Sequence, residues 1–363
     1  MRSLSIPTPR SSSSPWRTPA SATPRSSSGT PARARSAAAP FASAALALTL
    51  AFAATGCFSH ISESDLPADP IAFVQDTPSQ GILSAEQFRD ALSIDRPDDD
   101  IDYGKAKRNS RTSLALLDLR SGVVTTVPDA GQAFPLDWST DGTRLLVGRV
   151  DPYEGQLTLW TWNHLSGAWS QVSRNRSGLG AAMADGPIRL IWHGIQALPE
   201  GKKAGVIWIN TDEGGDQIVR GTRGCSTPDV APDGRTMVFA RKEPHSKLDS
   251  IILTATLGSD EVHEITRGSH PRFSRDGKWI VFERDMSSGN SDIWIMRPDG
   301  GSKHQITKTD YPEEFPAVSP DGRFVVYASA RGDVTESHLF VARVSDGVEQ
   351  EVTHSGQASR PVW

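Results

Sequence analysis

The sequence predicts an all-β fold built from repeated four-stranded units. The stretch 271–307 contains four short runs rich in β-branched and aromatic residues, separated by Asp276-Gly277, a polar loop and a second turn at 298–301. Asp-Gly pairs favour the tight turns of β-hairpins, because glycine readily adopts the positive φ that such turns require. One sheet of this size cannot bury both of its faces alone, so we expect the same unit to recur.

The unit does recur along the chain. Clear Asp-Gly turns are separated by 92, 43 and 45 residues, and an apolar residue lies three positions before each aspartate. These aspartates are Asp141, Asp233, Asp276 and Asp321. The doubled first interval predicts a degenerate copy at Asp185-Gly186, followed by a strand over 188–192. A hydrophobic residue also recurs at one register of the third strand, as Trp160, Trp208, Leu253, Trp294 and Phe340. This period is typical of a β-propeller with four strands per blade.

Three segments resemble a known repeat. VAPDGRTMVFAR, FSRDGKWIVFERD and VSPDGRFVVYAS are similar to the TolB-type propeller repeat of bacterial envelope proteins. The resemblance covers about 134–363 and implies antiparallel blades arranged around a central axis. It identifies a repeat family and assigns no particular activity.

The ring is predicted to have six blades, the first of them assembled from both ends of the chain. Residues 114–127 match the third and fourth strands of a unit, and 71–74 can supply the second. Residues 359–363 stop at the register of a first strand, so the C-terminal strand should complete the first blade. Pairing of the N- and C-terminal strands would close the ring and remove its open edges.

The first 56 residues predict a secretion signal that precedes the fold. Residues 1–32 are rich in Ser, Pro and Arg and are expected to be disordered. An apolar run over 41–54 has the length of a signal-peptide core and is too short to span a bilayer as a helix. It leads into ATGC, which ends at Cys57 and resembles the lipobox of bacterial lipoproteins. The resemblance implies a lipid on Cys57; an ordinary secretory signal and a transit peptide are the alternatives.

The remaining chain divides into two parts. Residues 57–69 are predicted to form a tether, and 70–363 the propeller. An insertion over about 77–112 combines a short helix with an acidic loop. Residues 1–62 contain several arginines and no acid, so the body of the protein is more acidic than the overall net charge of −5 indicates. This charge argues against nucleic acid as a partner.

Three residues outside the shared pattern were considered as sites. Trp162 and Trp169 have no counterparts at their registers in the other repeats, so they form a candidate binding patch. The recurring tryptophans of the third strands are instead expected to pack between blades. With Cys57 lipidated, Cys225 is unpaired, and we expect it to be a buried small residue rather than a reactive thiol.

No catalytic motif is present in the sequence. It lacks G-x-S-x-G, H-E-x-x-H, C-x-x-C and a phosphate-binding glycine loop, and its nine histidines are scattered. Peptidases with similar repeats carry their catalytic residues in a separate α/β-hydrolase domain, which we do not expect here. We therefore predict no enzyme, cofactor or metal.

The sequence favours a lipid-anchored, non-catalytic propeller that binds or scaffolds proteins in the bacterial cell envelope. Its partners would be the membrane, through Cys57, and other envelope proteins. Phe58 rather than Asp follows the cysteine, which favours the outer membrane, facing the periplasm or the cell surface. A sensor that recognises glycans or peptides is one alternative. A metal-dependent propeller hydrolase such as a lactonase, with acidic, amide or histidine ligands in the channel, is the other.

Overall fold

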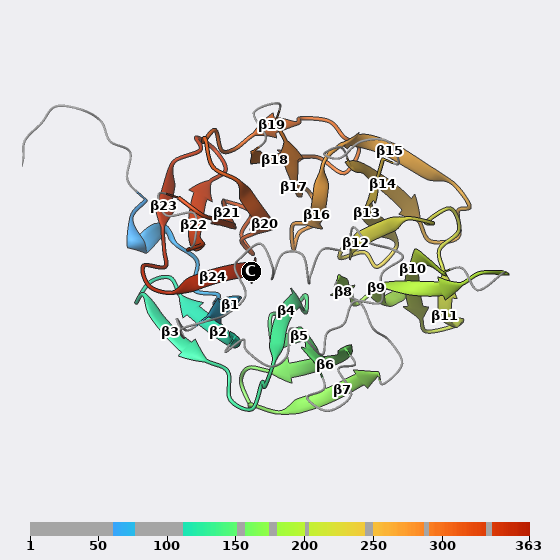
Figure 1. Cartoon of the computed structure of the whole chain (residues 1–363), viewed down its shortest axis with the longest axis horizontal. Coiled ribbons are helices and arrows are strands. Elements are labelled where there is room, and N and C mark those ends of the chain that lie inside the picture. Colours follow the sequence, from blue (N-terminus) through green and yellow to red (C-terminus); the bar gives the residue numbers. More distant parts are fainter. Residues whose placement is uncertain are drawn as a thin grey trace, which may run out of the picture. The chain divides into compact units, whose positions relative to one another are not determined.

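The protein forms a ring of six four-stranded antiparallel sheets around a central axis (Figure 1). The computed structural model describes residues 61–76, 112–150, 157–173, 180–199, 203–243, 250–286, 290–331 and 336–363. This confirms the predicted six-bladed β-propeller. The signal sequence, Cys57 and most of the predicted insertion, including its helix, lie outside the described residues.

The blades follow one another in chain order. The first contains β1 (Ile71–Asp76), β2 (Thr112–Asp118), β3 (Val123–Thr126) and the last strand, β24 (Gln357–Val362). The second and third contain β4 (Ala133–Trp138), β5 (Arg144–Val150), β6 (Leu157–Asn163), β7 (Trp169–Ser173), β8 (Ala181–Met183), β9 (Ile188–Ala197), β10 (Lys203–Thr211) and β11 (Gly215–Ile218). The fourth to sixth contain β12 (Cys225–Val230), β13 (Thr236–Lys242), β14 (Ser250–Thr256), β15 (Val262–Arg267), β16 (Ser269–Phe273), β17 (Ile280–Asp285), β18 (Ser291–Met296), β19 (His304–Gln305), β20 (Glu313–Val318), β21 (Phe324–Ser329), β22 (His338–Arg343) and β23 (Glu349–Glu351).

The first blade closes the ring as the sequence predicts. β24 pairs antiparallel with β1, and Ala72 faces Val362 across the two strands. Trp363 follows directly and is 6% exposed. Its indole N–H donates a hydrogen bond of 3.1 Å to the carbonyl oxygen of Asp69. The two ends of the propeller are therefore joined by backbone pairing and by a buried aromatic side chain.

The degenerate third unit is also confirmed. β8 and β9 flank Asp185-Gly186, and Ile188 donates its backbone N–H to the carbonyl of Gly234 in the next blade. A side chain at Gly186 would place its Cβ 2.3 Å from the carbonyl oxygen of Asp233. Only glycine allows two neighbouring turns to approach this closely.

Three of the other Asp-Gly turns, at Asp141, Asp276 and Asp321, share a hydrogen bond from a serine two positions before the aspartate. At Asp233 an alanine takes the place of the serine. In the fifth blade, Ser274 Oγ donates to Asp276 Oδ1 at 2.6 Å, and Trp279 N–H donates to Ser274 Oγ at 3.0 Å. Gly277 has a φ of 70°, as the turn requires. Side chain and backbone thus stabilise the same turn, which joins the first and second strands of a blade.

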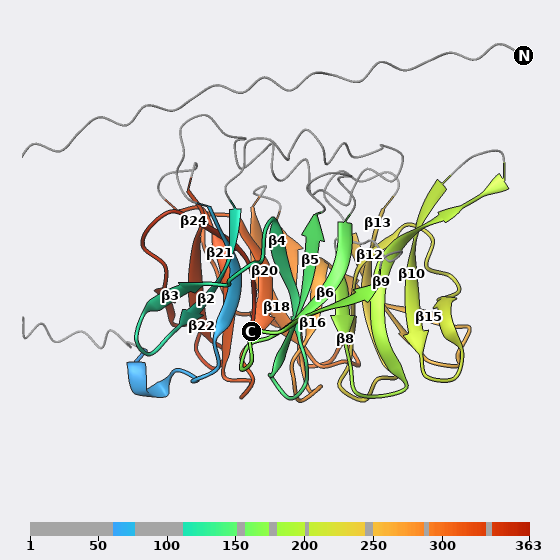
Figure 2. The same ribbon diagram turned by 90° about the horizontal axis from the view of Figure 1, so that it is seen from below.

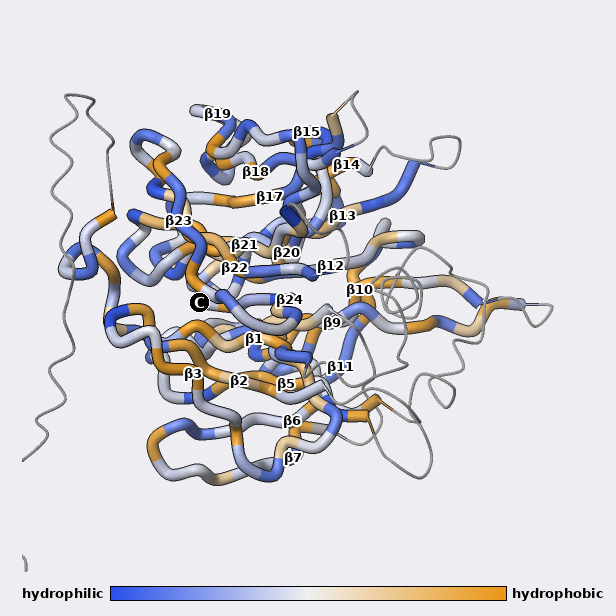
Figure 3. The backbone as a smooth tube through the Cα atoms, turned by 60° about the vertical axis from the view of Figure 1, so that its left-hand side comes forward, coloured by the Kyte–Doolittle hydropathy of each residue, from blue (hydrophilic) through white to orange (hydrophobic). Residues whose placement is uncertain are grey.

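Strands such as β1, β2 and β5 are largely hydrophobic, whereas the turns between strands are largely hydrophilic (Figure 3). The buried side chains form clusters between neighbouring blades; one joins the first and last blades through Ile71, Leu117 and Phe324. In the third-strand column, Leu253 and Phe340 are buried, whereas the tryptophans are partly exposed. Among the described residues, no helix has the length and apolar character needed to cross a membrane.

Residues 61–69, part of the predicted tether, are packed against the ring. They include a short 3₁₀ helix, η1 (Glu63–Asp65), and lie at the end of the ring where the Asp-Gly turns are found (Figure 2). Ile61 and Leu66 are 1% and 3% exposed. We call the end of the ring that carries the Asp-Gly turns the Asp-Gly face and the other end the opposite face.

Candidate functional site

The central channel is the site that the ring assembles from all of its blades. The inner strands β4, β12, β16, β20 and β24 each contribute one side chain at the register just before the recurring apolar residue. These side chains are Asp137, Asp229, Arg272, Ala317 and Val362. They line a cavity of about 60 Å³ that also touches Trp363. The volume has room for a few water molecules or a small polar group.

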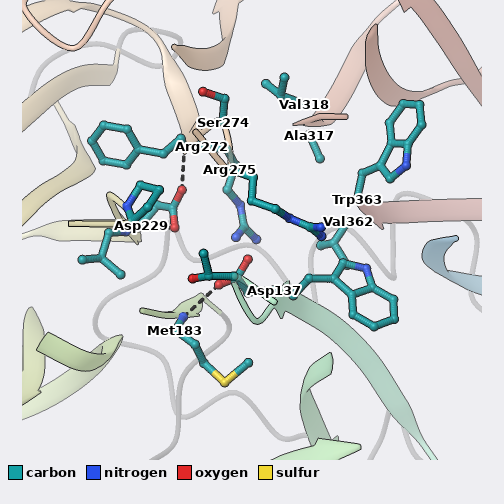
Figure 4. A pocket seen from close by; sticks show the side chains of 15 residues that line it. Asp137, Met183, Asp229, Arg272, Ser274, Arg275, Ala317, Val318, Val362 and Trp363 are labelled. Carbon is teal, nitrogen blue, oxygen red and sulfur yellow. Dashed lines mark hydrogen bonds between the residues drawn. The ribbon is translucent and has the colours of Figure 1, made fainter. Parts of the chain in front are cut away.

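Arg272 lies between two carboxylates in this cavity (Figure 4). Asp229 accepts the backbone N–H of Phe273 at 2.6 Å, and Asp137 accepts the backbone N–H of Met183 at 2.8 Å. Each of these hydrogen bonds joins neighbouring blades. Arg272 reaches across the channel and donates to the carbonyl oxygen of Leu136 at 2.6 Å. The three charged groups therefore tie four blades together at the axis.

The pKa values of the two carboxyl groups are raised. Burial, together with the nearby Asp229, raises the pKa of Asp137 to about 7, although the Arg272 guanidinium acts in the opposite direction. Burial also raises the pKa of Asp229, again against the lowering influence of Arg272. One positive charge thus faces two groups that are hard to ionise together.

A second cavity, of about 50 Å³, lies further along the channel toward the opposite face and shares Arg272 with the first. Four of its residues have a positive φ between 46° and 56°, although none is glycine. They are Thr227, His270, Phe315 and Arg360. Each directly precedes a proline, and each lies where the inner strand shifts register against its neighbour. Bulky residues avoid this conformation, so the surrounding ring must hold them in it.

These register shifts are β-bulges, and they bring polar and aromatic side chains together. His270 Nδ1 lies 2.8 Å from a carboxylate oxygen of Glu283, whose other oxygen accepts the backbone N–H of Phe315. Burial alone would lower the pKa of His270, but the Glu283 carboxylate outweighs this effect and raises it. The Arg360 guanidinium stacks on Phe315 at 4.8 Å and on Phe134 at 5.4 Å.

This arrangement is suited to recognition. The channel presents charges of both signs and two aromatic rings on a rigid frame of strands. Over the described residues, no group of three or more His, Cys, Asp or Glu side chains could hold a metal ion. The Arg272 side chain lies between the two channel aspartates, and its positive charge would repel a bound cation.

The sequence-derived candidates lie away from this channel. Trp162 is 5% exposed and packs at the boundary between the first two blades. Trp169 is partly exposed; its indole N–H donates to the carbonyl of Pro128 at 3.2 Å, and Arg149 stacks on its ring. Cys57 lies outside the described residues. Cys225 is 1% exposed, which confirms the expected burial, and burial raises its thiol pKa to about 12.

The charged channel residues were not predicted from the sequence, although a signal for two of them, His270 and Arg360, exists there. Thr-Pro, His-Pro, Phe-Pro and Arg-Pro recur before the apolar residue of four inner strands. The variable residue of each pair is the one that the bulge turns toward the axis.

Structural comparison shows which propellers this ring resembles. TolB from Acinetobacter baumannii matches with a TM-score of 0.58 at 17% identity, over 83% of this chain and 68% of that one. A putative TolB from Agrobacterium tumefaciens matches with a TM-score of 0.55 at 20% identity, over 68% of this chain and 90% of that one. The fold is that of a TolB-like β-propeller.

Curated relatives of the TolB-like propeller match it over part of their length. No family model matches the sequence. An uncharacterized protein of Agrobacterium fabrum is 31% identical over 105 residues, which is 29% of this chain and 36% of that protein. An uncharacterized peptidase of Bacillus subtilis, YuxL, is 29% identical over 113 residues, which is 29% of this chain and 17% of that protein. The matches thus cover about a third or less of these relatives.

Proposed function

We propose that the protein is a lipid-anchored binding module of the bacterial cell envelope, which holds a segment of another envelope protein at its central channel without catalysing a reaction. The observation that carries this proposal is the set of non-glycine residues held at positive φ around the second cavity. A strained backbone persists only where the rest of the structure enforces it, and such residues cluster at ligand sites.

We call the second cavity, around Phe315 and Arg360, the channel mouth. Its chemistry suits a peptide segment. Arg360, stacked on two phenylalanine rings, offers donors to carbonyl or carboxylate groups, and the exposed part of the Phe315 ring offers apolar contact. His270 adds a donor whose pKa is raised by Glu283. Extended protein segments are recognised by this combination of fixed polar groups and aromatic surface.

Binding is favoured over a peptidase activity and over the enzymatic alternative left open by the sequence, a metal-dependent hydrolase. The relative named as a peptidase matches over only 17% of its length. A metal-dependent hydrolase would need several ligands converging on one point, whereas the described part of the channel places Arg272 between its two aspartates.

The channel contact is tested by photo-crosslinking in the native envelope. A benzoyl-phenylalanine in place of Phe315 keeps the aromatic character of the mouth, and the same residue at Thr125, exposed on β3, is the matched control. We expect one discrete crosslinked envelope protein from position 315, lost when Arg360→Glu is added. Equal crosslinking at both positions would contradict recognition at the channel.

The anchor is tested separately. A radioactive fatty acid should label the protein, and Cys57→Ala should abolish the label. Undiminished label in the variant would refute lipidation at this cysteine. The anchor would locate the protein at the outer membrane, as expected from Phe58.

A further inference from the structure

The N-terminal segment 61–69 is fixed on the Asp-Gly face near the first and last blades. Ile61 and Leu66 are almost completely buried there and pack in one cluster with Leu117, Phe324 and Trp363. Since this cluster draws on the first blade and the sixth, the segment crosses the junction at which the ring is closed.

Hydrogen bonds hold the same segment along its length. Arg323, at the Asp-Gly turn of the sixth blade, donates to the carbonyl of Asp65 at 2.8 Å. Arg120, at the β2–β3 turn, donates to the carbonyl of Leu66 at 3.0 Å. Asp69 accepts the indole N–H of Trp363 and pairs with Arg275 at 3.4 Å. These contacts hold the segment at the end of the ring that carries the Asp-Gly turns (Figure 2).

The distance from this fixed segment to the lipid is short. Only four peptide steps separate Cys57 from Ile61. A fully extended chain spans at most about 3.6 Å per residue, so the lipidated residue lies within about 14 Å of Ile61 whatever conformation the chain adopts. This reach is less than half the thickness of the hydrocarbon core of a bilayer, about 30 Å.

We propose that the propeller lies with the Asp-Gly face of its first and sixth blades against the lipid surface, and that the channel mouth at Phe315 and Arg360 points away from the membrane. The inference rests on the proposed lipidation of Cys57. It specifies the face that a partner protein reaches: the one where the strained residues line the channel.

The charges of the Asp-Gly face are compatible with this position. Its turn aspartates have basic neighbours: Lys278 pairs with Asp276 at 2.9 Å, and Arg323 with Asp321 at 2.7 Å. Paired charges of this kind leave little net field to repel anionic lipid headgroups.

The test uses two cysteines at opposite ends of one strand of the sixth blade. Ser345 lies in the turn after β22, beside Val344, which donates its backbone N–H to the carbonyl of Arg323 on the Asp-Gly face. Glu336 precedes β22 at the opposite face. At about 3.3 Å per strand residue, the two sites are separated by roughly 25–30 Å. Ser345→Cys and Glu336→Cys therefore form a matched pair; Cys225, which is 1% exposed, contributes little labelling.

The full-length protein is purified from membranes and added to preformed vesicles of phosphatidylethanolamine and phosphatidylglycerol that contain a headgroup spin-labelled lipid. A fluorophore on each introduced cysteine reports proximity through quenching. We expect quenching at position 345 to exceed that at 336 at least threefold. A flexible Gly/Ser insertion of 20 residues after Cys57 should abolish the difference, because the short tether no longer fixes the orientation.

The outcomes separate the two proposals. The mass of the N-terminal peptide shows whether Cys57 carries lipid. An intact lipid with equal quenching at both positions, or stronger quenching at 336, would overturn the orientation and leave the anchor standing. An unmodified Cys57 would overturn the anchor and the orientation that depends on it.

Discussion

Replacing Trp363 by alanine tests whether closure of the ring stabilises the whole propeller. The indole is 6% exposed and packs in the cluster that joins the first and last blades. Truncation of a buried tryptophan to alanine costs about 3–5 kcal/mol of unfolding free energy. Loss of the hydrogen bond to the Asp69 carbonyl adds about 1 kcal/mol. We therefore expect a loss of about 4–6 kcal/mol, a large part of the 5–15 kcal/mol typical of folded domains.

The measurement is urea unfolding followed by far-UV circular dichroism, on protein that carries Cys57→Ala and is purified without lipid. Trp169→Ala is the matched control, because this ring is partly exposed on an outer strand and makes one hydrogen bond of 3.2 Å. We expect the control to lose about 1–2 kcal/mol. A loss from Trp363→Ala no larger than that from Trp169→Ala would refute the argument that the last residue holds the ring closed.

Three further predictions concern the channel and the turns. Because the pKa of Asp137 is raised to about 7 in the folded state, this carboxyl group favours folding fully below about pH 4 and loses that contribution as pH rises through 7. Asp137→Asn should therefore gain about 4 kcal/mol of stability relative to the unmodified protein when the pH is raised from 4 to 8, measured by urea titrations at the two pH values. An unchanged difference between the two proteins would contradict the raised pKa. Asp141→Asn should behave oppositely, because turn hydrogen bonds from Ser139 and Thr143 lower the pKa of Asp141 to about 2. The carboxylate stabilises the fold above about pH 4 and loses this contribution as pH falls through 2, so the variant should lose stability relative to the unmodified protein as pH rises from about 2 to about 4. In thermal unfolding, Gly186→Ala should cost about 2–3 kcal/mol, since its Cβ would meet backbone atoms at 2.3 and 2.5 Å, whereas Gly322→Ala, with open space and a φ of 73°, should cost about 1 kcal/mol. Equal losses in the two glycine variants would show that the turns of the third and fourth blades are not in close contact.

The repeat, the number of blades and the closing strand could all be predicted from the sequence. The local signals are strand propensity, Asp-Gly turns and apolar residues at fixed positions. They recur five times along the chain, about 44 residues apart. The burial of Cys225 could be predicted for the same reason, since it lies beside a recurring inner strand. Trp162 and Trp169 show the limit of this reasoning. They face each other across β6 and β7, yet one is buried between blades and the other reaches the surface.

Only the tertiary structure decided which residues form the channel site. Asp137, Asp229 and Arg272 come from three blades. They share one register of the repeat, just before the recurring apolar residue, but the repeat alone does not show that this register faces the axis or that the three side chains meet there. The bulges add a second reason: an extra residue breaks the period-two alternation, so a pattern of inward and outward positions cannot be read through Phe315 or Arg360. Repetition along the chain determines the ring, whereas the contacts at its axis exist only once the ring has closed.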